Sequence, residues 1–141
     1  MENYIVQQSI KIKAQPAQVW DALTNPNKTK KFFFQCKVFS DWKQGSSITF
    51  KGRIFYLFPI ELTGKIESIE QHKLLKYTLS NGKSTTHSTV TDTLSYDNGI
   101  TTLSISDDVG QGEGAEKRYK KSVKGWEKIL KGLKELVEEE N

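Results

Sequence analysis

The side chains that could carry out chemistry are few in this chain of 141 residues. It contains two histidines, His72 and His87, and a single cysteine, Cys36. Nucleophilic catalysis needs a base and an orienting group beside the nucleophile, and zinc needs three or four convergent ligands. These residues are far apart in the sequence, and no Gly-x-Ser-x-Gly motif is present. We therefore predict no catalytic residue, no metal site and no cofactor.

One carboxylate occupies an unusual position. Within the predicted strand 87–96, alternation places Asp92 on the same face as Val90, Leu94 and Tyr96. A carboxylate on a buried face must find a partner, become protonated or reach water in a cavity. One hypothesis is that Asp92 is a polar anchor for a ligand, or a base. The alternative is a bulge or register shift that turns Asp92 outward.

Aromatic residues are the main candidates for ligand contact. They lie at inward-facing strand positions, on the apolar face of the last helix, and in the segment beside Pro59. Small-molecule sites are largely apolar with a few polar groups, and tyrosine supplies both. Ordinary core packing is the alternative for each residue. The predicted ligand-binding set is Phe55, Phe58, Tyr77, Asp92, Tyr96, Tyr119 and Trp126.

The element that must position these residues is a long helix over 112–140. Its apolar residues recur at three- and four-residue spacing, which is typical of one buried helical face. They are Tyr119, Val123, Trp126, Ile129, Leu130, Leu133, Leu136 and Val137. Such a stripe needs an apolar surface opposite, and a helix laid across a curved sheet leaves a cavity between them. Because Glu138–Glu140 oppose the helix dipole, we expect the final turn to fray.

The rest of the chain supplies that sheet. Residues 4–12 alternate as a strand, a helix begins at Pro16 and is broken at Asn25-Pro26-Asn27, and a second short helix covers about 27–34. Six strands follow, at 37–41, 46–54, 60–69, 74–79, 87–96 and 101–107. Asn81-Gly82 and Asn98-Gly99 predict hairpins and hence antiparallel neighbours. The order predicts one α+β domain covering residues 1–141.

Composition and charge limit the classes of partner. No apolar run reaches the length of a membrane span, no signal peptide is evident, and one cysteine fits a reducing cytoplasm. The net charge is +4. The lysines of the last helix lie opposite its aromatic stripe, so no stacking platform for bases forms. We expect a cytoplasmic protein that binds neither nucleic acid nor membrane. Its oligomeric state stays open.

Several short motifs, in order, extend the argument to a family. They are Ile12-x-Ala14-x-Pro16-x-x-Val19-Trp20-x-Ala22-Leu23-Thr24-x-Pro26, Gly45 after Trp42, Gly64-x-Ile66-x-x-Ile69, Leu75-x-Tyr77, Thr89-Val90-Thr91 with Leu94, Gly99-x-Thr101-x-Leu103, and Gly125-Trp126-x-x-x-Leu130-x-x-Leu133. Together they resemble the START-like, helix-grip superfamily, in its branch of activator of heat-shock protein 90 ATPase homologues. Each motif consists of core and turn residues, and their order and spacing carry the resemblance.

The resemblance implies a helix-grip fold, with a curved seven-stranded antiparallel sheet wrapped around a long C-terminal helix and two short helices after the first strand. It also implies an apolar tunnel, because relatives bind lipids, sterols, hormones or polyketides and some are enzymes. The branch includes a two-domain co-chaperone. This chain has no room for the second of those domains.

Three functional hypotheses follow. The first is non-enzymatic binding of a small apolar or amphipathic ligand between sheet and helix, with access at 110–114 and 55–59. The second is a protein-interaction module that stimulates a heat-shock chaperone ATPase, which rests on the resemblance alone. The third is an enzyme resembling polyketide cyclases, with Asp92 or a tyrosine as the acid–base group.

Overall fold

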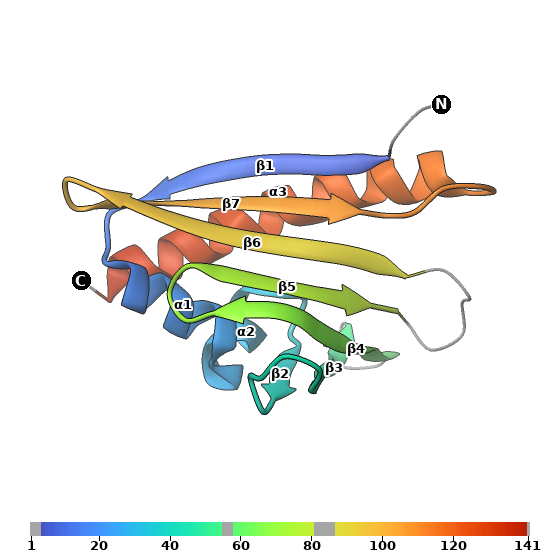
Figure 1. Ribbon diagram of the computed structural model, residues 1–141, viewed down its shortest axis with the longest axis horizontal. Coiled ribbons are helices and arrows are strands. Elements are labelled where there is room, and N and C mark those ends of the chain that lie inside the picture. The colour runs from blue at the N-terminus through green and yellow to red at the C-terminus, as the bar shows by residue number, and fades with distance from the viewer. Residues whose placement is uncertain (1–3, 55–57, 81–86, 141) are drawn as a thin grey trace.

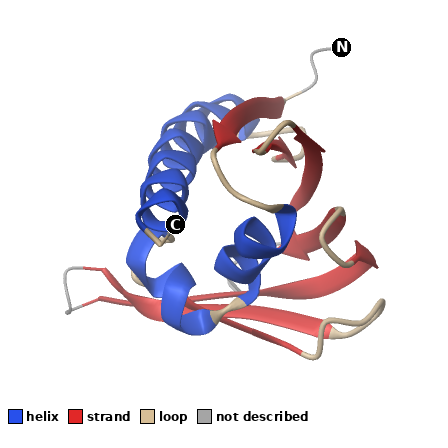
Figure 2. Ribbon diagram, turned by 90° about the vertical axis from the view of Figure 1, so that its left-hand side faces the viewer, coloured by secondary structure: helices blue, strands red, loops and turns tan. Residues whose placement is uncertain are grey.

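The computed structural model describes residues 4–54, 58–80 and 87–140, and contains one antiparallel sheet and three helices. The strands are β1 (Ile5–Ile12), β2 (Lys37–Ser40), β3 (Ser47–Ile54), β4 (Phe58–Glu70), β5 (Leu74–Leu79), β6 (Ser88–Asp97) and β7 (Ile100–Asp108). Their order across the sheet is β1-β7-β6-β5-β4-β3-β2, so only β1 crosses over to pair with a strand distant in sequence. The sheet is curved and does not close (Figure 2). This confirms the predicted α+β helix-grip fold.

Proline and asparagine set the start of both short helices and the break between them. α1 (Pro16–Thr24) and α2 (Pro26–Phe32) both have proline at their first position, where its missing N–H costs no hydrogen bond. Between them, the Asn25 side chain accepts a 3.0 Å hydrogen bond from the backbone N–H of Asn27 and caps α2. The predicted break between the helices is therefore confirmed, and α2 ends two residues earlier than expected.

The long helix α3 (Ala115–Glu139) and both short helices lie on one face of the sheet (Figure 1). An end-on view shows that this face is concave and that the sheet curls around the helices (Figure 2). α3 begins three residues later than predicted, after Gly114, whose φ of 80° is left-handed. Among the described residues, no helix is long and apolar enough to cross a membrane.

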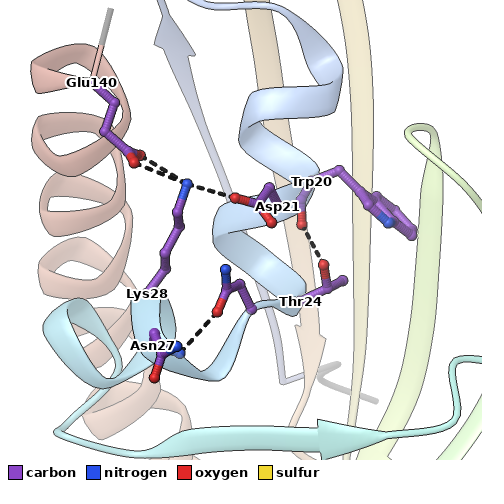
Figure 3. A network of polar contacts seen from close by, with 7 residues as sticks. Trp20, Asp21, Thr24, Asn27, Lys28 and Glu140 are labelled. Atoms are coloured by element: carbon purple, nitrogen blue, oxygen red, sulfur yellow. Dashed lines mark hydrogen bonds and ion pairs between the residues drawn. The ribbon is translucent and has the colours of Figure 1, made fainter.

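The final turn of α3 is bonded to the N-terminal part of the chain, which differs from the expected fraying. Lys28 Nζ lies 2.9 Å from Glu140 Oε2 and 2.5 Å from Asp21 Oδ2, so it links α3 to α1 (Figure 3). Glu138 Oε2 also accepts a 2.9 Å hydrogen bond from the backbone N–H of Lys13. These contacts compensate for the unfavourable position of the acidic residues in the helix dipole.

Candidate ligand cavity

A cavity of about 380 Å³ lies between the sheet and the first half of α3. This volume is within the range of small-molecule sites. Most of its accessible wall surface is apolar, and half of its lining residues are apolar or aromatic. The residues of this kind are Phe33, Phe34, Leu62, Leu79, Val90, Val109, Trp126 and Ile129. They come from β4, β5, β6, α3, the turn after α2 and the segment after β7, so the cavity exists only once the sheet has curved around the helix.

The two halves of α3 differ in what they bury. In the second half, Leu133 and Val137 are fully buried and fill the space above the sheet. In the first half, Ser122 and Gly125 line the cavity, and these small residues leave space that larger side chains would fill. A Cβ atom built on Gly125 would meet only the ring of Phe34, at 3.5 Å. The cavity therefore depends on small residues at one turn of α3.

Aromatic side chains form one side of the cavity. Phe33 stacks on Phe50 with ring centroids 4.4 Å apart and meets Trp126 edge-on at 6.0 Å. Phe34 is 45% exposed and lines the cavity from the turn between α2 and β2. Phe34 and Gln35 have left-handed φ values of 48° and 62°. Such conformations are unfavourable for residues other than glycine. The rings of Phe33 and Phe34 meet edge-on with their centroids 6.0 Å apart, and both line the cavity.

A buried carboxylate belongs to the polar part of the wall. Asp107, near the end of β7, is 5% exposed and lines the cavity. Its Oδ2 accepts hydrogen bonds from Ser122 Oγ at 2.5 Å and from Trp126 Nε1 at 2.9 Å. The two donors are four residues apart on α3, so they face the same carboxylate. This cluster joins the helix to the sheet at the wall of the cavity.

The glycine-rich segment 110–114 is held by one arginine at the edge of the cavity. Arg118 Nε donates to the carbonyl oxygen of Val109 at 3.1 Å, and its Nη1 donates to that of Glu113 at 2.9 Å. Nη2 lies 3.4 Å from the carbonyl oxygen of Gln111. The segment was predicted to border the ligand site, and Arg118, which lines the cavity, fixes it against α3.

Asp92 lies deeper than this cavity. β6 pairs with β7 in an uninterrupted register that sets Asp92 opposite Ile105, so no bulge turns the side chain outward. The outward alternative is therefore wrong. Asp92 is 2% exposed and borders an interior void of about 20 Å³, together with Tyr77. Phe33, Trp126 and Ile129 border both this void and the larger cavity, and thus lie between them.

The burial of these groups changes their proton affinities. Burial, with a further contribution from the charge of Asp107, raises the pKa of Asp92 to about 7. Burial, followed by the charges of Asp92 and Asp107, raises the pKa of Tyr77 well above its usual value. Among the described residues, no donor reaches Oδ1 of Asp92 or Oδ1 of Asp107. Tyr77 is thus a neutral phenol, whereas Asp92 changes charge near neutral pH.

The structure separates the predicted ligand-binding residues. Trp126 lines the cavity, and Tyr77 and Asp92 border the deeper void. Tyr119 is partly buried with its ring 6.1 Å from that of Tyr4. Tyr96 is 45% exposed, and its hydroxyl accepts a 2.8 Å hydrogen bond from Gln15 Nε2.

Tyr96 therefore does not share the buried environment of Val90 and Leu94, because it lies at the end of β6, close to the hairpin that leads to β7. Phe55 lies outside the described residues, as does the predicted turn at Asn81-Gly82. β4 begins at Phe58, whose side chain also lies outside the description.

Sequence reasoning missed several residues that line the cavity. Asp107 follows Ile105 by two positions, so the alternation that drew attention to Asp92 also places Asp107 on the inward face. Ser122 and Gly125 could have been recognised as small residues beside the apolar stripe. Arg118 gave no such signal, because an arginine at the start of a lysine-rich helix suggests a solvated face.

The remaining chemically active side chains do not gather at one place. His87 lines the cavity, whereas His72 lies in a turn with its ring 6.2 Å from Trp20. Cys36 is buried as a free thiol. Within the ranges that the structure describes, no group of three His, Cys, Asp or Glu side chains is arranged to hold a metal ion.

Comparison with solved structures supports the same architecture. The chain superposes with a TM-score of 0.78 on the solution structure of ChR145 from Cytophaga hutchinsonii, at 31% identity over 99% of this chain and 98% of that one. It superposes with a TM-score of 0.83 on MLL2253 from Mesorhizobium loti, at 20% identity over 97% and 98% of the two chains. CalU16 from Micromonospora echinospora matches with a TM-score of 0.72, at 22% identity over 94% and 72%.

Comparison of sequences identifies the family. No curated protein matches the chain. The family model described as "Activator of Hsp90 ATPase homolog 1-like protein" matches residues 13–138, which include α1, α2, all but the last residue of α3 and every strand except β1. The chain therefore belongs to the family of activator of Hsp90 ATPase homolog 1-like proteins, within the helix-grip superfamily.

Proposed function

We propose that this protein binds a small apolar or amphipathic molecule between its sheet and α3 without converting it chemically. The observation that carries the proposal is the cavity of about 380 Å³, whose wall surface is mostly apolar. An apolar molecule that enters such a space leaves water and contacts many side chains at once. Asp92 and Tyr77 border the deeper void and not this cavity, which argues against acid–base catalysis by these two residues.

Mass spectrometry of freshly purified protein under native and denaturing conditions tests the proposal. A reproducible mass excess that disappears on denaturation is the expected result, and it gives the mass of the ligand. Titration with Nile red, an apolar fluorescent probe, measures whether the cavity admits a ligand after any bound molecule has been removed. The absence of both the mass excess and probe binding would overturn the proposal.

A variant that fills the cavity locates the binding. Gly125→Leu adds a side chain at the cavity wall, and leucine favours a helix more than glycine does. We therefore expect the variant to stay folded and to lose probe binding. Lys124→Leu is the matched control, because Lys124 is exposed on the same helix and does not line the cavity. Equal probe binding by both variants would exclude this cavity as the site.

A second candidate is interaction with a chaperone ATPase, which is favoured by the family match over residues 13–138. The description of the family concerns its members in general, so the candidate needs a direct assay. Adding the protein to the Hsp90-type chaperone of its own cell should raise the ATPase rate if this role exists. An unchanged rate, together with no complex in sedimentation, would exclude it.

A further inference from the structure

The proposed ligand cavity is exposed and polar at one end and buried and apolar at the other. Residues four apart on a helix lie in one row, and one such row of α3 lines the cavity. It runs from Lys121, which is exposed, through the partly buried Gly125 to the buried Ile129. A second row changes in the same direction and consists of Arg118, Ser122 and Trp126. The first turns of α3 thus supply the polar end of the cavity.

The sheet side of the cavity has the same polarity. His87, just before β6, is exposed, whereas Val90 within the strand is buried. β6 and α3 begin at the same end of the molecule (Figure 1). A Cβ atom built on Gly110 would lie 3.8 Å from Nη2 of Arg118 and 3.9 Å from the carbonyl oxygen of His87, so the polar ends of the two walls adjoin. A ligand with one polar end and an apolar body matches this arrangement.

The polar end carries positive charge that no acidic side chain of the described residues pairs with. The guanidinium of Arg118 donates to three carbonyl oxygens, which hold it in place without neutralising it. Neither Arg118 nor Lys121 forms an ion pair with a described residue. The ammonium of Lys121 has three N–H donors and makes no hydrogen bond to the described residues. These donors are therefore available to an acceptor on a ligand.

The one carboxylate in the wall does not occupy these cations. Asp107 has one oxygen closed off from the cavity, and the other accepts hydrogen bonds from Ser122 and Trp126. The acidic residues of the adjoining segment, Asp108 and Glu113, do not line the cavity. Two cations and one carboxylate leave the wall with one net positive charge. A ligand with a single negative charge would neutralise it, whereas a cationic ligand would add to it.

We propose that the cavity takes apolar carboxylic acids in their ionised form, with the carboxylate at Lys121 and the apolar body between the sheet and α3. This inference rests on the proposed function, since it names the class of molecule that the same cavity binds. Lys121 contacts the carboxylate, and the fixed charge of Arg118 attracts it to the same end. Because this end is exposed, the carboxylate keeps part of its hydration, and the buried apolar lining supplies most of the affinity.

Three naphthalene probes of similar size test the proposal by calorimetric titration at neutral pH. They are 2-naphthylacetate, which is anionic; 2-naphthylacetamide, its neutral counterpart of the same shape; and 2-(2-naphthyl)ethylamine, which is cationic. We expect wild-type protein to bind the acetate about 10-fold more tightly than the amide at low ionic strength, as for a hydrogen bond between charged groups. The difference should shrink at high ionic strength, because the charges are exposed. The amine should bind most weakly.

Two substitutions at Lys121 locate the carboxylate, and both are at an exposed position where the fold should tolerate them. Lys121→Met should reduce the preference for the acetate over the amide to less than about 3-fold, while the affinity for the amide stays unchanged. Lys121→Glu should reverse the order, so that the amine binds more tightly than the acetate. Lys124→Met and Lys124→Glu are the matched controls. They change the net charge of the same helix equally but lie outside the cavity, so the wild-type order should remain.

The possible results are distinguishable. Equal affinities of wild-type protein for the acetate and the amide would overturn the choice of a carboxylate while leaving ligand binding intact. A preference for the acetate that survives Lys121→Met unchanged would overturn the assignment of Lys121. Equal losses in Lys121→Met and Lys124→Met would show an effect of net charge and would overturn it as well. Failure of all three probes and of Nile red to bind would instead contradict the proposed function itself.

Discussion

The indole Nε1 of Trp126 donates a 2.9 Å hydrogen bond to Oδ2 of Asp107, and this contact joins α3 to β7 at the wall of the cavity. Ser122 Oγ donates to the same oxygen at 2.5 Å. An apolar helix face usually settles onto a sheet by close packing, which fills the space between them. Here the first half of α3 is attached through a polar cluster, so small residues can remain at the wall and the cavity is retained.

Trp126→Phe should therefore destabilise the protein. The change removes one hydrogen bond to a charged acceptor, worth about 1.5–3 kcal/mol, and leaves part of the indole volume empty. The free energy of unfolding, measured by urea denaturation, should fall by about 2–4 kcal/mol. Ser122→Ala removes the other donor and should cost about 1–3 kcal/mol.

Because both donors bind one oxygen, the double variant tests the cluster directly. The two losses should not add, and the coupling should be at least about 0.5 kcal/mol. Additive effects would mean that the two contacts act independently. In that case the polar cluster would not be the unit that joins α3 to the sheet.

Asp92 should make stability depend on pH. Its pKa rises from 3.8 to about 7, so between these values the folded protein retains a proton that the unfolded chain has lost. The free energy of unfolding must then fall as the pH rises through this window and level off above it. Each pKa unit corresponds to about 1.4 kcal/mol, which gives a loss on the order of 4 kcal/mol.

Asp92→Asn should remove this dependence, because the amide does not ionise. Urea denaturation should show the variant to be more stable than wild type near pH 8 and close to wild type near pH 4.5. Asp97→Asn, at an exposed position, serves as the control and should follow the wild-type curve. A wild-type curve that rises between about pH 4 and 7, with no effect of Asp92→Asn, would contradict the assignment.

Arg118→Met should loosen the segment 110–114. The variant loses the hydrogen bonds that the guanidinium donates to the carbonyl oxygens of Val109 and Glu113, and the aliphatic stem is kept. We expect faster amide hydrogen exchange in this segment and an increase of about 3- to 10-fold in the dissociation rate of a bound probe. Lys117→Met, at the exposed neighbouring position, should change neither. Unchanged exchange in Arg118→Met would show that the segment is held by other contacts.

Lys28→Met should release the end of α3 from α1. Lys28 is hydrogen-bonded to Asp21 and Glu140, which together raise its pKa (Figure 3). Because the two carboxylates are partly open to water, the loss of stability should be about 1 kcal/mol or less and should shrink in high salt. Lys73→Met, which breaks an exposed pair with Glu70, is the control and should have no measurable effect. A salt-independent loss in Lys28→Met would indicate lost packing of the aliphatic stem instead.

The sequence by itself determined nearly every element. Pro16 and Pro26 occupy the first positions of α1 and α2. Asn98 and Gly99, with φ values of 51° and 81°, form the turn between β6 and β7. The three- and four-residue spacing of apolar residues predicted α3. These signals are local, because they depend on backbone conformations and side-chain periodicity within a few residues. The family resemblance extended them to the order of the elements and hence to the fold.

Only the tertiary structure decided where the cavity lies and which residues form it. Alternation put Asp92 and Asp107 on one face of the sheet, but it could not show that the first borders a closed void and the second the larger cavity. The same limit applies to Tyr96. Alternation predicted an inward side chain, whereas Tyr96 is exposed because it lies at the end of β6. Cavities are the space that remains after distant segments pack, so their position depends on the curvature of the sheet and the tilt of α3, which no local pattern encodes.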